Sequence, residues 1–223
     1  QLPGYGPTCP GRARHKPTTA QTDDGADVGS DMLCVMDSEP CLFVITGIMA
    51  SGKSTVAQAL AERFDRAVHV RGDTYRRFVV RGREEMTATP TQEAFAQLHL
   101  RYELAATTAD RYVSAGFVTV VQDVIVGPIL GDALAMFRTR PLHLVVLAPA
   151  PAVAARRDRE RVKTGYRTIT AEALDHELRE NTPRLGVWID NGELRVDETV
   201  DQILDRRHEA LVHLVPPGQD VAK

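Results

Sequence analysis

Short, wholly apolar runs alternate with segments of helical periodicity between residues 41 and 205 of the chain. Apolar or β-branched runs of this kind between turn-forming residues are typical of buried strands. Five runs predict strands at Leu42–Thr46, Ala67–Val70, Phe117–Val121, Leu142–Leu147 and within the sequence GVWID at 186–190. Apolar residues three and four apart predict helices at Thr55–Phe64, Thr91–Ser114, Pro128–Phe137, Ala150–Val162, Thr170–Glu180 and from Asp197 onward.

The longest and the last of these helices carry an apolar face. In the segment 91–114 we expect one buried face, made of Phe95, Leu98, Tyr102, Ala106, Ala109 and Val113. For the last helix we expect Asp197 to be the N-cap and the apolar face to consist of Val200, Leu204, Leu211 and Leu214.

Strands that are apolar throughout and alternate with helices indicate a parallel sheet covered on both faces, and therefore a three-layer α/β fold. We expect one domain over residues 39–214, a disordered leader over 1–38 and a frayed tail over 215–223. The leader is rich in Gly, Pro, Thr and Asp and lacks periodicity, so it cannot bury enough apolar surface to order. Met32 and Met36 precede the first strand, and the natural start is expected there.

Composition narrows the class of protein only a little. The 223 residues are 43% hydrophobic and 26% charged, and the net charge of −3 gives no overall attraction to nucleic acid or to anionic membranes. No apolar run is long enough to span a bilayer. Cys9, Cys34 and Cys41 lack metal-site spacing, so reduced thiols in a cytoplasmic protein are expected.

The stretch TGIMASGKST, Thr46 to Thr55, fits the pattern G-x-x-x-x-G-K-[ST] between a predicted strand and a predicted helix. In this pattern, the backbone N–H groups of Gly47, Ala50, Ser51 and Gly52 can turn toward phosphate oxygens, beside a helix N-terminus. Lys53 can reach the β- and γ-phosphates, the Ser54 hydroxyl can ligate Mg²⁺, and Thr55 follows it. The alternative is a glycine-rich turn with an exposed lysine. We expect a nucleoside triphosphate, ATP, with Mg²⁺.

Four stretches, GIMASGKST, VRGDTYRR, VTVVQDV and ARRDRERVKTGY, resemble the landmarks of small AAA-type P-loop kinases. That group includes gluconate and shikimate kinases, 5′-hydroxyl polynucleotide kinases and chloramphenicol phosphotransferases, and the resemblance is greatest to the last. The resemblance implies a five-stranded sheet in the order 2-3-1-4-5, a short arginine-rich lid at about 156–169, and phosphoryl transfer to a hydroxyl. It also implies that Asn191, in the loop after the last strand, approaches the adenine.

Asp73 follows the second predicted strand, and the carboxyl ends of parallel strands face the ligand crevice. There Asp73 can accept a substrate hydroxyl's proton or orient that hydroxyl for attack, a role that the resemblance also implies. The alternative is an N-cap of a short helix. Asp123 ends an apolar strand and can assist Mg²⁺ binding, although Gln122 beside it could face the metal instead, and a turn-forming role is also open.

Two arginine-rich segments complete the candidate residues. Arg157 and Arg161 are four apart on a basic helix, and the resemblance implies that they close over the phosphates; a solvated helix face is the alternative. Arg76 and Arg77, with Arg81, Arg83 and the aromatic Tyr75 and Phe78, could hold an acidic substrate or a nucleic-acid end, or could face solvent.

We therefore expect an ATP-dependent phosphotransferase that acts on a hydroxyl of a small molecule such as an antibiotic or a sugar. One alternative is a kinase of nucleic-acid 5′-hydroxyls or, as in zeta-type toxins, of nucleotide-sugars. A second alternative, from a different class, is a nucleotide-dependent switch that slowly hydrolyses its nucleotide to control a partner. The presence of Asp73 favours the kinase over the switch, and the modest net charge disfavours nucleic acid.

Overall fold

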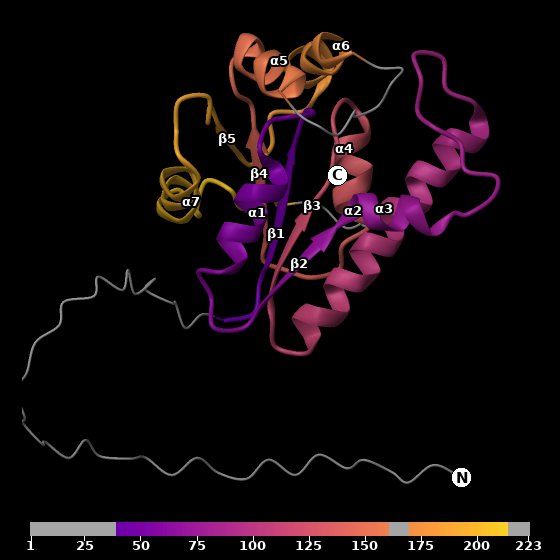
Figure 1. The fold of residues 1–223 in the computed structure, drawn as a ribbon. Helices are drawn as coiled ribbons and strands as arrows, with labels where there is room; N and C mark the ends of the chain where they lie inside the picture. Colours follow the sequence, from indigo (N-terminus) through magenta and orange to yellow (C-terminus); the bar gives the residue numbers. More distant parts are fainter. Residues whose placement is uncertain (1–38, 161–169, 214–223) are drawn as a thin grey trace, which may run out of the picture. The chain divides into compact units, whose positions relative to one another are not determined.

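Five parallel strands form one sheet in the order β2-β3-β1-β4-β5 (Figure 1). The strands are β1 (Leu42–Gly47), β2 (Ala67–Arg71), β3 (Val118–Gln122), β4 (Leu142–Leu147) and β5 (Val187–Ile189). The structure is a computed structural model that describes residues 39–160 and 170–213. The predicted parallel sheet and the strand order implied by the resemblance are confirmed. The leader, the tail and the lid residues 161–169, including Arg161, lie outside the described residues.

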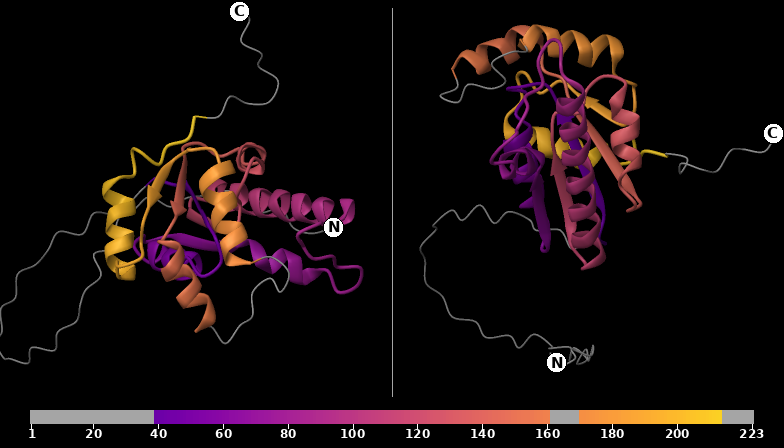
Figure 2. Two further views of the ribbon diagram at one scale, coloured as in Figure 1. Left: turned by 90° about the horizontal axis from the view of Figure 1, so that it is seen from above. Right: turned by 90° about the vertical axis from the view of Figure 1, so that its right-hand side faces the viewer.

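Helices cover both faces of the sheet, so the predicted three-layer α/β fold is confirmed. Helices α1 (Lys53–Ala61) and α7 (Val196–Asp205) pack on one face, and α3 (Gln92–Ser114), α4 (Ile129–Ala135) and the π-helical turn η1 (Glu177–Asn181) on the other. Helix α2 (Gly72–Phe78) packs against α3. Helices α5 (Pro151–Arg159) and α6 (Ala171–His176) lie beyond the carboxyl ends of the strands (Figures 1 and 2).

The central strand β1 shows why the predicted strands are apolar throughout. Leu42 and Val44 pack toward α3 and α4, whereas Phe43 and Ile45 pack toward α1 and α7, and all four side chains are fully buried. Side chains of a strand alternate between the two faces, so a sheet covered twice needs an apolar residue at every position.

Helix α3 departs from the expected pattern at its first turn. The Phe95 side chain is 49% exposed, so the prediction that it is buried is wrong, whereas Tyr102, Ala106 and Ala109 are buried as expected. The first turn instead buries Ala94, which lies about 100° around the helix axis from Phe95. The N-cap is Thr91, whose hydroxyl accepts the Ala94 N–H at 3.0 Å.

The last helix begins earlier and ends earlier than predicted. Its N-cap is Arg195 and not Asp197, because the Arg195 N–H donates to the Glu198 carboxylate at 2.8 Å and closes the first turn. The helix ends at Asp205, and Leu211 lies beyond it, in an antiparallel bridge with His143. The predicted helical face therefore does not extend to Leu211. Leu214 lies outside the described residues.

No helix among residues 39–160 and 170–213 has the length and apolar character needed to cross a membrane.

Candidate active site

The glycine loop connects β1 to α1 at the carboxyl edge of the sheet. Gly47 has φ +145°, and a Cβ atom there would lie 2.4 Å from the Leu147 carbonyl oxygen. Ala50 and Gly52 have φ values of +57° and +92°, so the backbone is left-handed at both. Such a conformation turns successive N–H groups to one side. Gly52 is the N-cap of α1 and provides no side-chain hydrogen bond, so the first N–H groups of the helix remain available to an anion.

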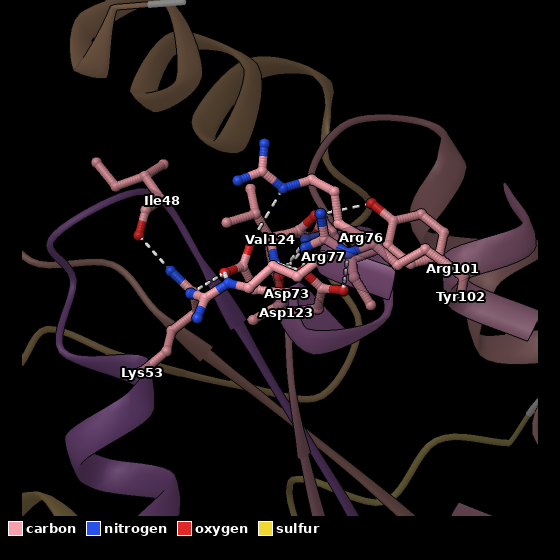
Figure 3. A network of polar contacts seen from close by, with 11 residues as sticks. Ile48, Lys53, Asp73, Arg76, Arg77, Arg101, Tyr102, Asp123 and Val124 are labelled. Carbon is pink, nitrogen blue, oxygen red and sulfur yellow. Dashed lines mark hydrogen bonds and ion pairs between the residues drawn. The ribbon is translucent and has the colours of Figure 1, made fainter. Parts of the chain in front are cut away.

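Lys53 folds back over this loop. Its Nζ atom donates to the Ile48 carbonyl at 2.5 Å and lies 3.5 Å from the Ser51 hydroxyl, and the residue is only 8% exposed (Figure 3). Ser54 and Thr55, in the first turn of α1, are exposed. The loop thus presents a buried ammonium group and two hydroxyl groups on one helical turn, the set that binds phosphate and Mg²⁺ in loops of this sequence.

Asn191 and Arg157 hold the loop after β5 against the glycine loop. The Asn191 amide donates to the Ser51 carbonyl at 2.9 Å, and its Oδ1 atom is buried with no hydrogen-bond partner within the described part of the chain. Arg157, on α5, donates to the carbonyls of Asn191 and Gly192 at 3.1 and 2.9 Å. Three segments that are distant in sequence therefore meet at the glycine loop.

Asp73 lies in the first turn of α2, directly beyond β2. The N-cap of α2 is Arg71, so the alternative that Asp73 is the cap is wrong. The carboxylate instead accepts from Arg76 Nε at 3.2 Å and from Arg77 Nε at 2.9 Å, and Figure 3 shows both arginines converging on it. Burial acts to raise the pKa of Asp73, but the hydrogen bond from Arg77 and the charges of three nearby arginines outweigh it and hold the pKa below its ordinary value.

Arg76 and Arg77, expected to bind substrate, are thus both engaged with Asp73. Arg76 also pairs with Glu85, and Arg83 lies 3.3 Å from the same carboxylate. The side chain of Arg77 is 66% exposed, so its pairing with Asp73 is accessible to solvent and to a ligand. A substrate role for these two arginines remains a prediction.

Asp123 follows β3 and is 3% exposed. Val120 packs on the α1 side of the sheet and Val121 on the α3 side, so alternation places Gln122 toward α1 and Asp123 toward α3. There the Asp123 carboxylate accepts from Arg101 Nε at 2.7 Å and from the Val124 N–H at 2.7 Å (Figure 3). Its role toward a metal remains a prediction.

Arg101 is the residue of this network that the sequence interpretation missed. It is 5% exposed, and its charge acts on Asp73 as well as on Asp123. A signal was present, because Arg101 falls on the apolar face of the 91–114 helix, three residues after Leu98 and next to Tyr102. A charged residue on a buried face indicates a buried partner.

Comparisons with known proteins agree with this fold. A family model described as an AAA domain matches residues 42–183. No curated protein sequence matches the chain. Among solved structures, an unliganded sugar kinase from Janibacter sp. HTCC2649 is similar, with a TM-score of 0.56 at 18% identity over 78% of this chain and 99% of that one.

Two further structures have the same fold. A gluconokinase from Sinorhizobium meliloti 1021 gives a TM-score of 0.52 at 20% identity, over 76% of this chain and 92% of that one. A tunicamycin resistance protein from Deinococcus radiodurans gives a TM-score of 0.53 at 18% identity, over 78% of this chain and 99% of that one. At these identities the similarity shows the fold alone. The family model, by contrast, spans more than half of the sequence, and the chain therefore belongs to the AAA domain family.

Proposed function

We propose that the protein transfers the γ-phosphoryl group of ATP to a hydroxyl group of a small molecule. The observation that carries the proposal is that the glycine loop after β1 and Asp73 after β2 stand at the same edge of one parallel sheet. Ligands of such sheets bind at that edge. The names of the similar structures, a sugar kinase and a gluconokinase, support a kinase that acts on small molecules.

The phosphates would lie in the glycine loop. The N–H groups of residues 50–53 would donate to phosphate oxygens, and Lys53 would exchange its contact with the Ile48 carbonyl for the β- and γ-phosphates. Ser54 would hold Mg²⁺, which when bound neutralises charge on these phosphates. Asp123 accepts two contacts from Arg101 and one from Val124, which leaves about one of a carboxylate's four acceptor sites, and with it Asp123 would orient the water around the metal.

Asp73 would engage the acceptor hydroxyl. Its lowered pKa makes it a weak base, so its main effect would be to orient the hydroxyl oxygen toward the γ-phosphorus. The bond from the hydroxyl oxygen to phosphorus forms while the bond from phosphorus to the bridging oxygen of ADP breaks. Phosphoryl transfer has a loose transition state, so the hydroxyl proton can leave late, to Asp73 or to water. Arg157 and Arg161 would offset the charge on the transferring group.

Two variants test the proposal with γ-labelled ATP and a panel of alcohols, sugars, nucleosides and oligonucleotides. Asp73→Asn keeps the size of the side chain but removes the charge that holds it against Arg76 and Arg77 and orients the hydroxyl, so we expect near-normal Mg·ATP affinity and transfer lowered by about 10²-fold or more. Lys53→Ala should weaken ATP binding itself, because it removes a charged hydrogen bond worth about 1.5–3 kcal/mol.

The same experiment separates the alternatives. A nucleotide-dependent switch has no acceptor, so its slow hydrolysis would tolerate Asp73→Asn. Transfer to oligonucleotides alone would identify a nucleic-acid kinase. Normal ATP affinity in a folded Lys53→Ala variant would show that the glycine loop does not hold phosphate.

A further inference from the structure

A cavity of about 170 Å³ lies between α2, the segment 79–86 and α3. Most of its wall is apolar, and the apolar side chains include Tyr75, Phe78, Val79, Met86, Leu98 and Leu104. An apolar cavity of about 150 Å³ is large enough to hold a benzene ring. The space therefore fits one ring or one branched alkyl group, and the polar part of its lining consists of Arg76, Glu84, Glu85, Gln97 and Arg101.

Large apolar side chains around this cavity are unusually exposed. Phe78 is 67% exposed, and Leu100 and Leu104, which also line the cavity, are 48% and 40% exposed. Large apolar side chains that gather at one hollow commonly mark a binding surface. Covering them with an apolar ligand would remove this surface from water, a gain of about 25 cal/mol per Å².

Two arginines that line the cavity contact the carboxylates of the candidate active site. Arg76 lines the cavity and donates to Asp73 at 3.2 Å, and Arg101 lines it and donates to Asp123 at 2.7 Å. A ligand whose apolar part filled the cavity would thus have its other end beside the groups that contact Asp73. A hydroxyl on that other end is what the transfer reaction requires.

We propose that this cavity binds the apolar part of the acceptor, a ring or branched alkyl group of about six carbon atoms. The enzyme therefore selects alcohols that carry such a group over sugars and sugar acids. The inference rests on the proposed function, because it names the acceptor class of the same site. The charged residues of the lining, Arg76 and Glu85 among them, accommodate hydrogen-bonding substituents near the hydroxyl.

The test measures binding separately from turnover. Met86 lines the cavity, and its methyl signal can be assigned with Met86→Leu in protein labelled at its five methionine methyl groups. In the presence of Mg·ADP, cyclohexylmethanol should shift this signal saturably, with a Kd lower than that of glycerol or gluconate by about tenfold or more. With ATP, cyclohexylmethanol should be phosphorylated with a correspondingly higher kcat/KM.

Matched variants test whether cyclohexylmethanol binds in the cavity. Phe78→Ala removes an exposed wall residue and should raise the Kd for cyclohexylmethanol by about tenfold, whereas Phe95→Ala, at an exposed phenylalanine of α3 outside the cavity, should not. Ala94→Leu should fill the cavity and abolish the methyl shift. If Ala94→Leu does not fold, the comparison of the Kd for cyclohexylmethanol in Phe78→Ala and Phe95→Ala tests the cavity assignment.

Failure of this inference differs from failure of the proposed function. If gluconate is phosphorylated and cyclohexylmethanol neither binds nor reacts, the kinase assignment holds and the cavity assignment is wrong. Equal changes of the Kd for cyclohexylmethanol in Phe78→Ala and Phe95→Ala would overturn the cavity assignment as well. If Mg·ATP does not bind, the proposed function fails, whereas a saturable, Phe78-dependent shift at Met86 would still support an apolar ligand in the cavity.

Discussion

Arg101 and Asp123 form a buried ion pair that ties the middle of α3 to the carboxyl end of β3. The Arg101 Nε atom donates to Asp123 Oδ2 at 2.7 Å, and the two residues are 5% and 3% exposed. A buried guanidinium in this position also keeps positive charge near Asp73. The same pair therefore holds α3 against β3, and the charge of Arg101 favours the ionised form of Asp73 at the candidate active site.

Arg101→Met should destabilise the fold strongly, because it leaves the Asp123 carboxylate buried without its partner. Loss of one member of a buried pair costs about 3–5 kcal/mol. Urea unfolding monitored by circular dichroism measures the change. Arg111→Met, at an exposed position of the same helix, is the control and should change stability by about 0.5 kcal/mol or less. Adding Asp123→Asn to Arg101→Met should recover part of the loss; equal effects of the Arg101 and Arg111 variants would contradict the pairing.

Gly72→Ala should displace the Asp123 carboxylate, because the backbone of Gly72 lies close to it. A Cβ atom at position 72 would lie 1.8 Å from Asp123 Oδ2, so we expect a loss of about 1–3 kcal/mol from overpacking and a displaced Asp123. Gly131→Ala is the matched control, because nothing lies within 4 Å of its added methyl group in α4, and it should stabilise by about 0.5–1 kcal/mol. Thermal unfolding measures the stability of both variants. If Gly72→Ala is as stable as the wild type, Asp123 can move without a cost in stability.

The strands and the glycine loop were predictable because their signals are local. A strand buried on both faces must be apolar throughout, and the loop between β1 and α1 needs its glycines at fixed positions, so both appear directly in the sequence. The strand order came from the resemblance, since periodicity does not say which strands are neighbours.

The arrangement of the candidate active site was less predictable because it depends on contacts between distant segments. The exposure of Phe95 and the cavity beside Phe78 depend on how α2 and α3 meet. The contact of Arg157 with the Asn191 carbonyl joins residues 34 positions apart, and no spacing within the basic helix indicates it. Side-chain identity gave the chemistry of these residues, but tertiary packing determines their partners.

Arg157→Ala tests whether this arginine acts in transfer or only holds the loop after β5. If it offsets charge during transfer, kcat should fall by about tenfold or more, equivalent to about 1.4 kcal/mol or more, while ADP affinity changes little. If it only supports Asn191 and the glycine loop, ADP affinity should fall together with kcat. Arg156→Ala, at the exposed neighbouring position, is the control. Steady-state kinetics on an accepted alcohol and ADP titration calorimetry separate the two outcomes.

His143 is another buried polar residue and lies in β4. It is 3% exposed, its Nδ1 lies 3.3 Å from the Leu42 carbonyl, and its Nε2 accepts from Arg207 Nε at 3.2 Å, as a neutral imidazole can. Burial and the charge of Arg207 lower the pKa of His143 to about 4, although the hydrogen bond to the Leu42 carbonyl acts to raise it. The imidazole thus holds Arg207, which follows α7, and the backbone of His143 also forms an antiparallel bridge with Leu211.

Stability should therefore decrease as the pH falls from about 6.5 to about 4, the ordinary and the folded pKa of His143. In this window the unfolded chain binds a proton that the folded protein does not, so protonation favours unfolding. Burial and Arg71 lower the pKa of His69 to about 4 as well, so both histidines contribute. Urea unfolding at about pH 7 and about pH 5 measures the loss. It should be smaller in His143→Gln and in His69→Gln than in the wild type, and unchanged in His99→Gln, at an exposed position of α3. An equal loss in the wild type and in both His143→Gln and His69→Gln would show that neither imidazole is kept neutral by the fold.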